Sequence, residues 1–121
     1  MTLVDTSVWV DHFRRGDPAL VDLLNDGQVL MHPFVRGELA LGNLKARADT
    51  LRLLSDLAHV TVAEESEVLH IVESRKLMGL GIGLIDAHLL ASAMLASCKL
   101  YTKDKRLLAV GTELKIAYLA T

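Results

Sequence analysis

Four acidic side chains lie where the sequence predicts that strands end and helices begin. Asp5 follows the first short apolar run of the chain, and Asp104 follows a later one. Asp86 opens a long apolar helix, while Glu38 lies one turn into the helix after the second strand. Ligands of an open α/β sheet bind at the carboxyl ends of its strands. We therefore expect all four carboxylates to reach the same edge of the sheet.

Four clustered carboxylates need a cation, because like charges repel each other and disfavour ionisation. Most neighbours of Glu38 and Asp86 one helical turn away are apolar, so an unpaired charge would be costly at both positions. Oxygen ligands without His or Cys spacing favour Mg²⁺, or Mn²⁺, over Zn²⁺. Such an ion makes bound water a nucleophile and stabilises a leaving alkoxide. The chemistry predicted for these residues is phosphodiester hydrolysis.

Simpler roles are also open to these residues. Asp5 and Asp104 could be N-caps of the helices that follow them, and Asp86 could complement the positive end of its helix. The basic residues beside Asp104 could hold substrate phosphates or form an exposed turn; they are Lys103, Lys105 and Arg106. The formal charge of −2, from 13 basic and 15 acidic side chains, gives no overall attraction for nucleic acid. Nucleic-acid binding would therefore depend on local patches or on a metal ion.

Strands alternate with helices along the whole chain. Apolar or β-rich runs predict strands at 2–4, 28–31, 59–62, 100–102 and 116–119. Helical spacing, N-cap residues and prolines predict helices at 6–14, 18–26, 33–41, 46–57, 64–77, 85–97 and 105–111. This alternation predicts a parallel sheet with helices on both faces.

The composition fits one domain with an aliphatic core. Of 121 residues, 51% are hydrophobic and only 4% are aromatic. This apolar excess favours a dimer or another protein partner. The lone Cys98 excludes an internal disulfide framework and suits a reducing cytoplasm. We expect no signal peptide, and we interpret 77–98 as a loop and a buried helix, because glycines and Asp86 argue against a membrane span.

Four motifs in the chain resemble those of one family. The segment LVDTSVW at 3–9 resembles the opening motif of PIN-domain toxins of the VapC type. VRGEL at 35–39, IDAHLLA at 85–91 and LYTKDKRL at 100–107 are similar to the second, third and fourth acidic motifs of that family. The motifs occur in the family's order, and the resemblance covers the whole chain.

The resemblance implies a role for each site residue. Asp5 and Asp86 would be the main metal ligands, and Glu38 and Asp104 would complete the acidic pocket. Asp104 would act through water or through a second ion. The supporting residues Ser7 and Thr102 would hold waters or orient the acids. The implied fold is a single PIN domain over residues 1–121. Its architecture would be a three-layer α/β/α sandwich, with a five-stranded parallel sheet of order 3-2-1-4-5.

The resemblance also implies an activity and partners. The activity would be Mg²⁺-dependent endonucleolytic cleavage of RNA by the toxic component of a toxin–antitoxin module. The partners would be a second copy of the chain and a VapB-type antitoxin whose C-terminal tail covers the toxin. The protein would be cytoplasmic, with no membrane association.

Other classes fit the sequence less well. A haloacid-dehalogenase-type phosphatase needs a second Asp two residues after the first, where this chain has Ser7. A receiver domain needs a phospho-acceptor Asp after the third strand, where this chain has Ala-Glu-Glu at 63–65. The remaining alternative is a non-catalytic RNA- or protein-binding module, which needs no buried acids. His88 could face the pocket, but we interpret all five histidines as structural or exposed.

Overall fold

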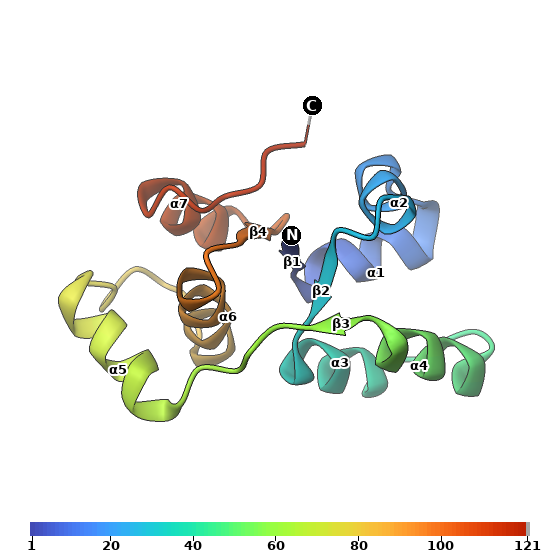
Figure 1. Cartoon of the computed structure of the whole chain (residues 1–121), viewed down its shortest axis with the longest axis horizontal. Helices are drawn as coiled ribbons and strands as arrows, with labels where there is room; N and C mark the ends of the chain where they lie inside the picture. Colours follow the sequence, from blue (N-terminus) through green and yellow to red (C-terminus); the bar gives the residue numbers. More distant parts are fainter. Residues whose placement is uncertain (121) are drawn as a thin grey trace.

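The computed structural model describes residues 1–120 and shows an α/β fold built on one parallel sheet (Figure 1). Its strands follow the order β3-β2-β1-β4. They are β1 (Thr2–Val4), β2 (Val29–Met31), β3 (Ala58–His59) and β4 (Lys99–Tyr101). Leu3 of β1 pairs with Leu30 of β2 on one side and with Leu100 of β4 on the other. The predicted α/β class and the predicted order of the first four strands are confirmed.

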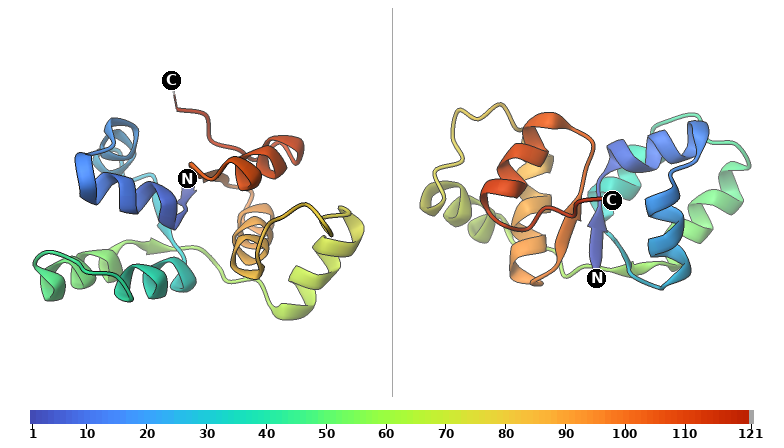
Figure 2. Two further views of the ribbon diagram at one scale, coloured as in Figure 1. Left: turned by 180° about the vertical axis from the view of Figure 1, so that it is seen from behind. Right: turned by 90° about the horizontal axis from the view of Figure 1, so that it is seen from above.

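Helices cover both faces of the sheet, as the alternation of elements predicts. They are α1 (Thr6–Arg15), α2 (Pro18–Asn25), α3 (Pro33–Ala40), α4 (Arg47–Asp56), α5 (Glu65–Ser74), α6 (Leu84–Leu95) and α7 (Lys105–Glu113). In Figure 1, α2 and α7 are drawn toward the top of the view and α3, α4 and α5 toward the bottom, with the strands between them, and Figure 2 gives the same arrangement from behind. Helix α6 packs against β4 and α5, and α3 packs against α1 and α4.

Capping residues fix where three of these helices begin. Asp17 accepts a hydrogen bond from Leu20 N at 2.8 Å, and Pro18 is the first residue of α2. His32 caps α3 in the same way through its Nδ1 atom. Asp104 caps α7. Each cap binds a backbone N–H of the first helical turn, which would otherwise have no partner within the helix.

The core is aliphatic and centred on β1, where Leu3 and Val4 have no exposed surface. The buried residues of α6 face nearly every side of that helix; they are Ala87, Leu89, Leu90, Ala91, Ser92 and Ala93. This burial explains why the same stretch resembles a membrane span in the sequence. Within residues 1–120, we find no helix with the length and apolar character needed to cross a membrane.

The predicted fifth strand at 116–119 is not formed as a strand. Residues 1–120 contain four strands, and the C-terminal segment adds one isolated parallel bridge between Leu100 and Ala117. Two backbone hydrogen bonds hold it beside β4, from Leu100 N to Ile116 O at 2.8 Å and from Tyr118 N to Leu100 O at 2.9 Å. Lys115, just before the bridge, adopts a left-handed φ of 62°. The C-terminal segment therefore lies beside β4, where the fifth strand was predicted, but pairs with it at a single residue pair.

Further differences from the predicted bounds concern α5, β3 and α7. Helix α5 ends at Ser74, so the predicted basic end at 75–76 follows the helix instead of lying in it. The third strand is Ala58–His59 instead of 59–62. Helix α7 continues to Glu113, beyond the end predicted at Gly111, and Gly111 lies beside Ala117.

Candidate active site at the carboxyl edge of the sheet

Asp5 lies directly after β1 and is only 6% exposed. It occupies the N-cap position of α1, but its carboxylate makes no capping bond to that helix. Its Oδ2 atom instead accepts hydrogen bonds from Ser7 Oγ and Thr102 Oγ1, both at 2.7 Å. Within residues 1–120, Oδ1 of Asp5 accepts no hydrogen bond. Two hydroxyl groups therefore orient this carboxylate and leave one oxygen for another ligand.

Thr102 joins Asp5 to Asp104. The Thr102 hydroxyl donates to Asp5 and accepts a hydrogen bond from Asp104 N at 3.1 Å. Asp104 also caps α7, because its Oδ1 atom accepts a hydrogen bond from Leu107 N at 2.9 Å. The capping role considered for Asp104 is therefore present, while the one considered for Asp5 is not.

Glu38 reaches the same edge from α3 and is half-buried. Its Oε1 atom accepts a hydrogen bond from Thr6 Oγ1 at 2.7 Å. Thr6 is the first residue of α1 and follows Asp5 directly. Thr6 is not among the site residues predicted from the sequence, although its hydroxyl beside Asp5 in the first motif was a signal for it.

Asp86 lies in the first turn of α6, where its Oδ2 atom accepts a hydrogen bond from Gly83 N at 3.0 Å. Burial raises the pKa of Asp86, and the Gly83 N–H opposes that shift. Repulsion from Asp5, Asp104 and Glu38 raises the pKa further. The other three acids are therefore close enough for their charges to act on Asp86, and we refer to these four residues as the acidic site.

The acidic site is open, and its donors suit a hard cation. Within residues 1–120, no group of three or more Asp, Glu, His or Cys side chains is arranged so that it could hold a metal ion. Mg²⁺ does not need such a group, because it keeps several waters and takes one or two carboxylates directly. A bound cation would give the Oδ1 atom of Asp5 a partner, and it would offset the repulsion between Asp86 and the other carboxylates.

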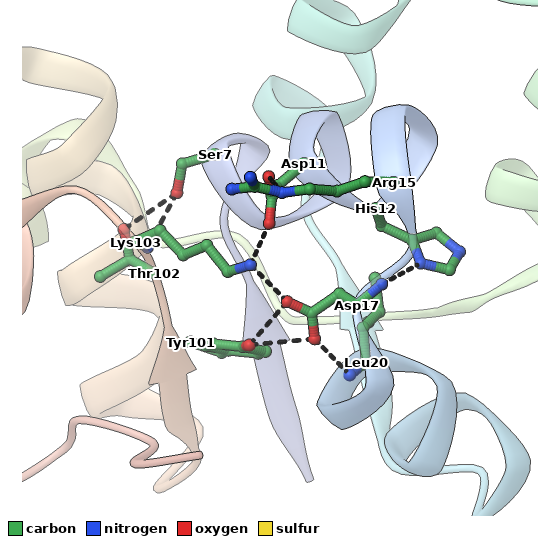
Figure 3. Close-up of polar contacts among 9 residues, drawn as sticks. All are labelled: Ser7, Asp11, His12, Arg15, Asp17, Leu20, Tyr101, Thr102 and Lys103. Carbon is green, nitrogen blue, oxygen red and sulfur yellow. Dashed lines mark hydrogen bonds and ion pairs between the residues drawn. The ribbon is translucent and has the colours of Figure 1, made fainter.

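The three basic residues predicted to hold phosphates lie in different surroundings. The Lys103 side chain forms ion pairs with Asp11 and Asp17 (Figure 3). Arg106 lies against Gly81, where a Cβ atom would come within 2.9 Å of Arg106 Nη1. Lys105 is exposed at the start of α7. Phosphate binding by Lys105 and Arg106 stays a prediction, whereas Lys103 is already held by two carboxylates.

The histidines nearest the site are structural in character. His32 has no exposed surface, and its Nδ1 atom accepts a hydrogen bond from Phe34 N at 3.0 Å. Burial, and then repulsion from His88, lowers the pKa of His32 to about 4. The His88 ring packs edge-on against Phe34, with centroids 4.9 Å apart. The buried Nδ1 atom of His88 has no hydrogen-bond partner within residues 1–120.

Comparisons with known proteins agree with this fold and with a nuclease relationship. The PIN domain family profile matches residues 2–113. Ribonuclease VapC32 of Mycobacterium tuberculosis, in two strains, is 47% identical over 118 residues. That similarity covers 97% of this chain and 95% of the relative.

Two solved structures share the fold at low sequence identity. The structure of FitAB bound to an IR36 DNA fragment gives a TM-score of 0.65 at 18% identity, over 100% of this chain and 99% of that chain. PAE2754 from Pyrobaculum aerophilum gives 0.60 at 19% identity, over 90% of this chain and 78% of that one. At such identities the likeness concerns the fold alone.

Proposed function

The chain belongs to the PIN-domain family of VapC-type ribonucleases, and from this premise we propose that it is a Mg²⁺-dependent endoribonuclease. It hydrolyses phosphodiester bonds of RNA at the acidic site and acts as the toxic component of a toxin–antitoxin module. We also treat residues 1–121 as a single PIN domain, since the buried residues from Leu3 to Val110 form one hydrophobic cluster. The observation that carries the proposal is geometric. Ser7 and Thr102 hold Oδ2 of Asp5, Thr102 also binds the backbone of Asp104, and Thr6 beside Asp5 binds Glu38.

We divide the acids into two pairs, as the family resemblance implies. Asp5 and Asp86 would hold the Mg²⁺ ion, with Mn²⁺ as the alternative, and Glu38 and Asp104 would complete the pocket through water or a second ion. When bound, the metal supplies an activated water and neutralises charge on the phosphate and the leaving oxygen. Ser7 and Thr102 hold Oδ2 of Asp5, so that its Oδ1 atom has a fixed direction.

Lys105 and Arg106 would hold the RNA phosphates beside Asp104. Both lie in the first turn of α7 and have exposed side chains. Within residues 1–120, neither forms an ion pair with an acidic side chain. Their charge is therefore available to a phosphate, which the net charge of the chain would not attract.

A groove beside Glu38 supports the proposed protein partner. It has a volume of about 730 Å³ and lies between α1, α3 and the segment after α3. Its lining includes the apolar side chains of Val10, Phe13, Leu39 and Leu44. We place the tail of a VapB-type antitoxin here, where it would cover apolar surface and also approach the acidic site. A homodimer and a cytoplasmic location complete the proposal.

The test is cleavage of a labelled RNA by the parent chain and by Asp5→Asn, with Mg²⁺ and with EDTA. We expect cutting only by the parent with Mg²⁺, because Asp5→Asn removes a charged ligand and EDTA removes the ion. Asp56→Asn makes the same substitution at an exposed residue of α4 and should cut like the parent. Equal cutting by Asp5→Asn would overturn the mechanism. RNA binding without any cutting by the parent would support the non-catalytic module instead.

A further inference from the structure

Lys103 directly precedes Asp104, yet its side chain extends toward Asp11 of α1 and toward Asp17, which caps α2 (Figure 3). Its Nζ atom pairs with Asp11 Oδ2 and, at 2.5 Å, with Asp17 Oδ2. Its backbone N–H donates a hydrogen bond to Ser7 Oγ at 3.0 Å. Both ends of this residue therefore bind elements that lie far from it in the sequence.

Asp17, the buried partner of the Lys103 ion pair, accepts several further hydrogen bonds. Asp17 is 4% exposed and accepts hydrogen bonds from Leu20 N at 2.8 Å and from Tyr101 OH at 3.0 and 3.1 Å. Burial alone would raise the pKa of Asp17, but hydrogen bonds from Lys103, Leu20 and Tyr101 lower it below the ordinary value. Asp17 therefore stays charged and fixed, and its charge holds Lys103 in turn.

Hydrogen bonds connect Lys103 and its neighbour Thr102 to Asp5 of the acidic site. The Ser7 hydroxyl that accepts the Lys103 N–H donates to Asp5 at 2.7 Å, and the Thr102 hydroxyl donates to the same oxygen. Thr102 also accepts the N–H of Asp104. Any displacement of this turn would move the Thr102 hydroxyl and the backbone of Asp104, and it would break the hydrogen bond from Lys103 N to Ser7 Oγ.

We propose that Lys103 is a positioning residue for the acidic site and does not bind substrate phosphate. Its ion pairs tie the turn between β4 and α7 to α1 and α2, and its N–H holds the Ser7 hydroxyl against Asp5. This inference deepens the proposed function and rests on it for the catalytic readout. Phosphate binding is left to Lys105 and Arg106.

The kinetic test compares Lys103→Met, Asp17→Asn and the double variant on one RNA substrate with saturating Mg²⁺. We expect kcat to fall about tenfold in each single variant, as for other residues that orient metal ligands, with KM close to that of the parent. The double variant should be no slower than the slower single variant, because both changes remove the same interaction. Lys99→Met removes an exposed lysine earlier on β4 and serves as the matched control.

A phosphate-binding lysine would give a different kinetic result. Lys103→Met would then raise KM and leave kcat unchanged, because binding is lost while the acidic site stays intact. Asp17→Asn would then keep the parental kcat and lower KM, because the lysine is released toward the substrate. Either result would overturn the proposal.

A second readout does not depend on RNA cleavage. Hydrogen exchange in EDTA measures the backbone amides of Lys103 and Asp104, which donate to the Ser7 and Thr102 hydroxyls. We expect faster exchange at both amides in Lys103→Met and Asp17→Asn, and parental exchange in Lys99→Met. Asp11→Asn replaces Asp17→Asn if the latter does not fold. Unchanged exchange would overturn the positioning role, even where the parent is inactive and the proposed function has failed separately.

Discussion

Two groups of acidic side chains meet the end of β4, and they differ in how their charge is balanced. Asp11 and Asp17 share the cation of Lys103, and the pKa of both carboxylates is lowered. No such lysine or arginine pairs with the acidic site within residues 1–120. There the pKa of Asp86 is raised by burial and by repulsion from the other three carboxylates.

The difference separates a structural use of acids from a chemical one. An acid with its own lysine contributes to folding, because removing either partner leaves a poorly solvated charge behind. Acids that repel one another reduce stability until a cation joins them, and stability given up at a site commonly accompanies activity. Substitutions in the two groups should therefore change stability in opposite directions.

The largest effect should follow from Asp86→Asn. We expect RNA cleavage to fall at least about 100-fold, because even partners that only orient metal ligands can cost that much. In EDTA the same variant should be more stable than the parent by about 1 kcal/mol, because a neutral amide feels no repulsion and can still accept the Gly83 N–H. Urea unfolding and RNA cleavage measure the two quantities. If Asp86→Asn were less stable than the parent in EDTA, repulsion among the four acids would not be what lowers stability at this site.

The second prediction concerns the stability of the protein at acid pH. It depends on His32, a buried side chain that forms no ion pair within residues 1–120. Its pKa is lowered to about 4 from an ordinary value of 6.5, so the native state binds the proton less well than the unfolded chain. Stability should be full above pH 6.5 and fall toward pH 4, by up to about 3 kcal/mol. Protonation would also break the cap, because Nδ1 could no longer accept from Phe34 N.

The measurement for His32 is urea unfolding across that pH range. His32→Asn can keep a capping oxygen and carries no titrating ring, so its stability should depend less on pH than that of the parent. His70→Asn changes an exposed histidine and should keep the parental pH dependence. An equal pH dependence in His32→Asn and the parent would show that another group is responsible.

A smaller effect is expected at Asp17. Asp17→Asn should lower the free energy of unfolding by about 2 kcal/mol at neutral pH, because the amide keeps a cap but loses the charged bond to Lys103. The contribution is present above the ordinary pKa of 3.8 and is lost as the pH falls through the lowered native value. Asp22→Asn, exposed on the same helix, should leave urea unfolding unchanged. A gain in stability at Asp17→Asn would contradict the distinction between the two groups.

The sequence by itself determined the elements and the edge at which the acids gather. Asp17 and Pro18 predicted the start of α2 because a cap and a proline act within one helical turn. The apolar run at 2–4 predicted a buried β1 because only apolar residues can fill both faces of a central strand. Placement of Asp5, Asp86 and Asp104 at strand or helix ends followed from these elements, while their roles as ligands stay predictions.

Only the tertiary structure decided which side chains became partners. Lys103 and Asp104 are adjacent, yet one turns toward Asp17 and the other stays at the acidic site. The bond from Thr6 to Glu38 and the reduction of the fifth strand to a single bridge were not readable from local patterns either. Local rules govern the first turn of a helix or the alternation of a strand. Contacts between residues many positions apart depend instead on how packed helices orient, and that is fixed only when the whole core forms.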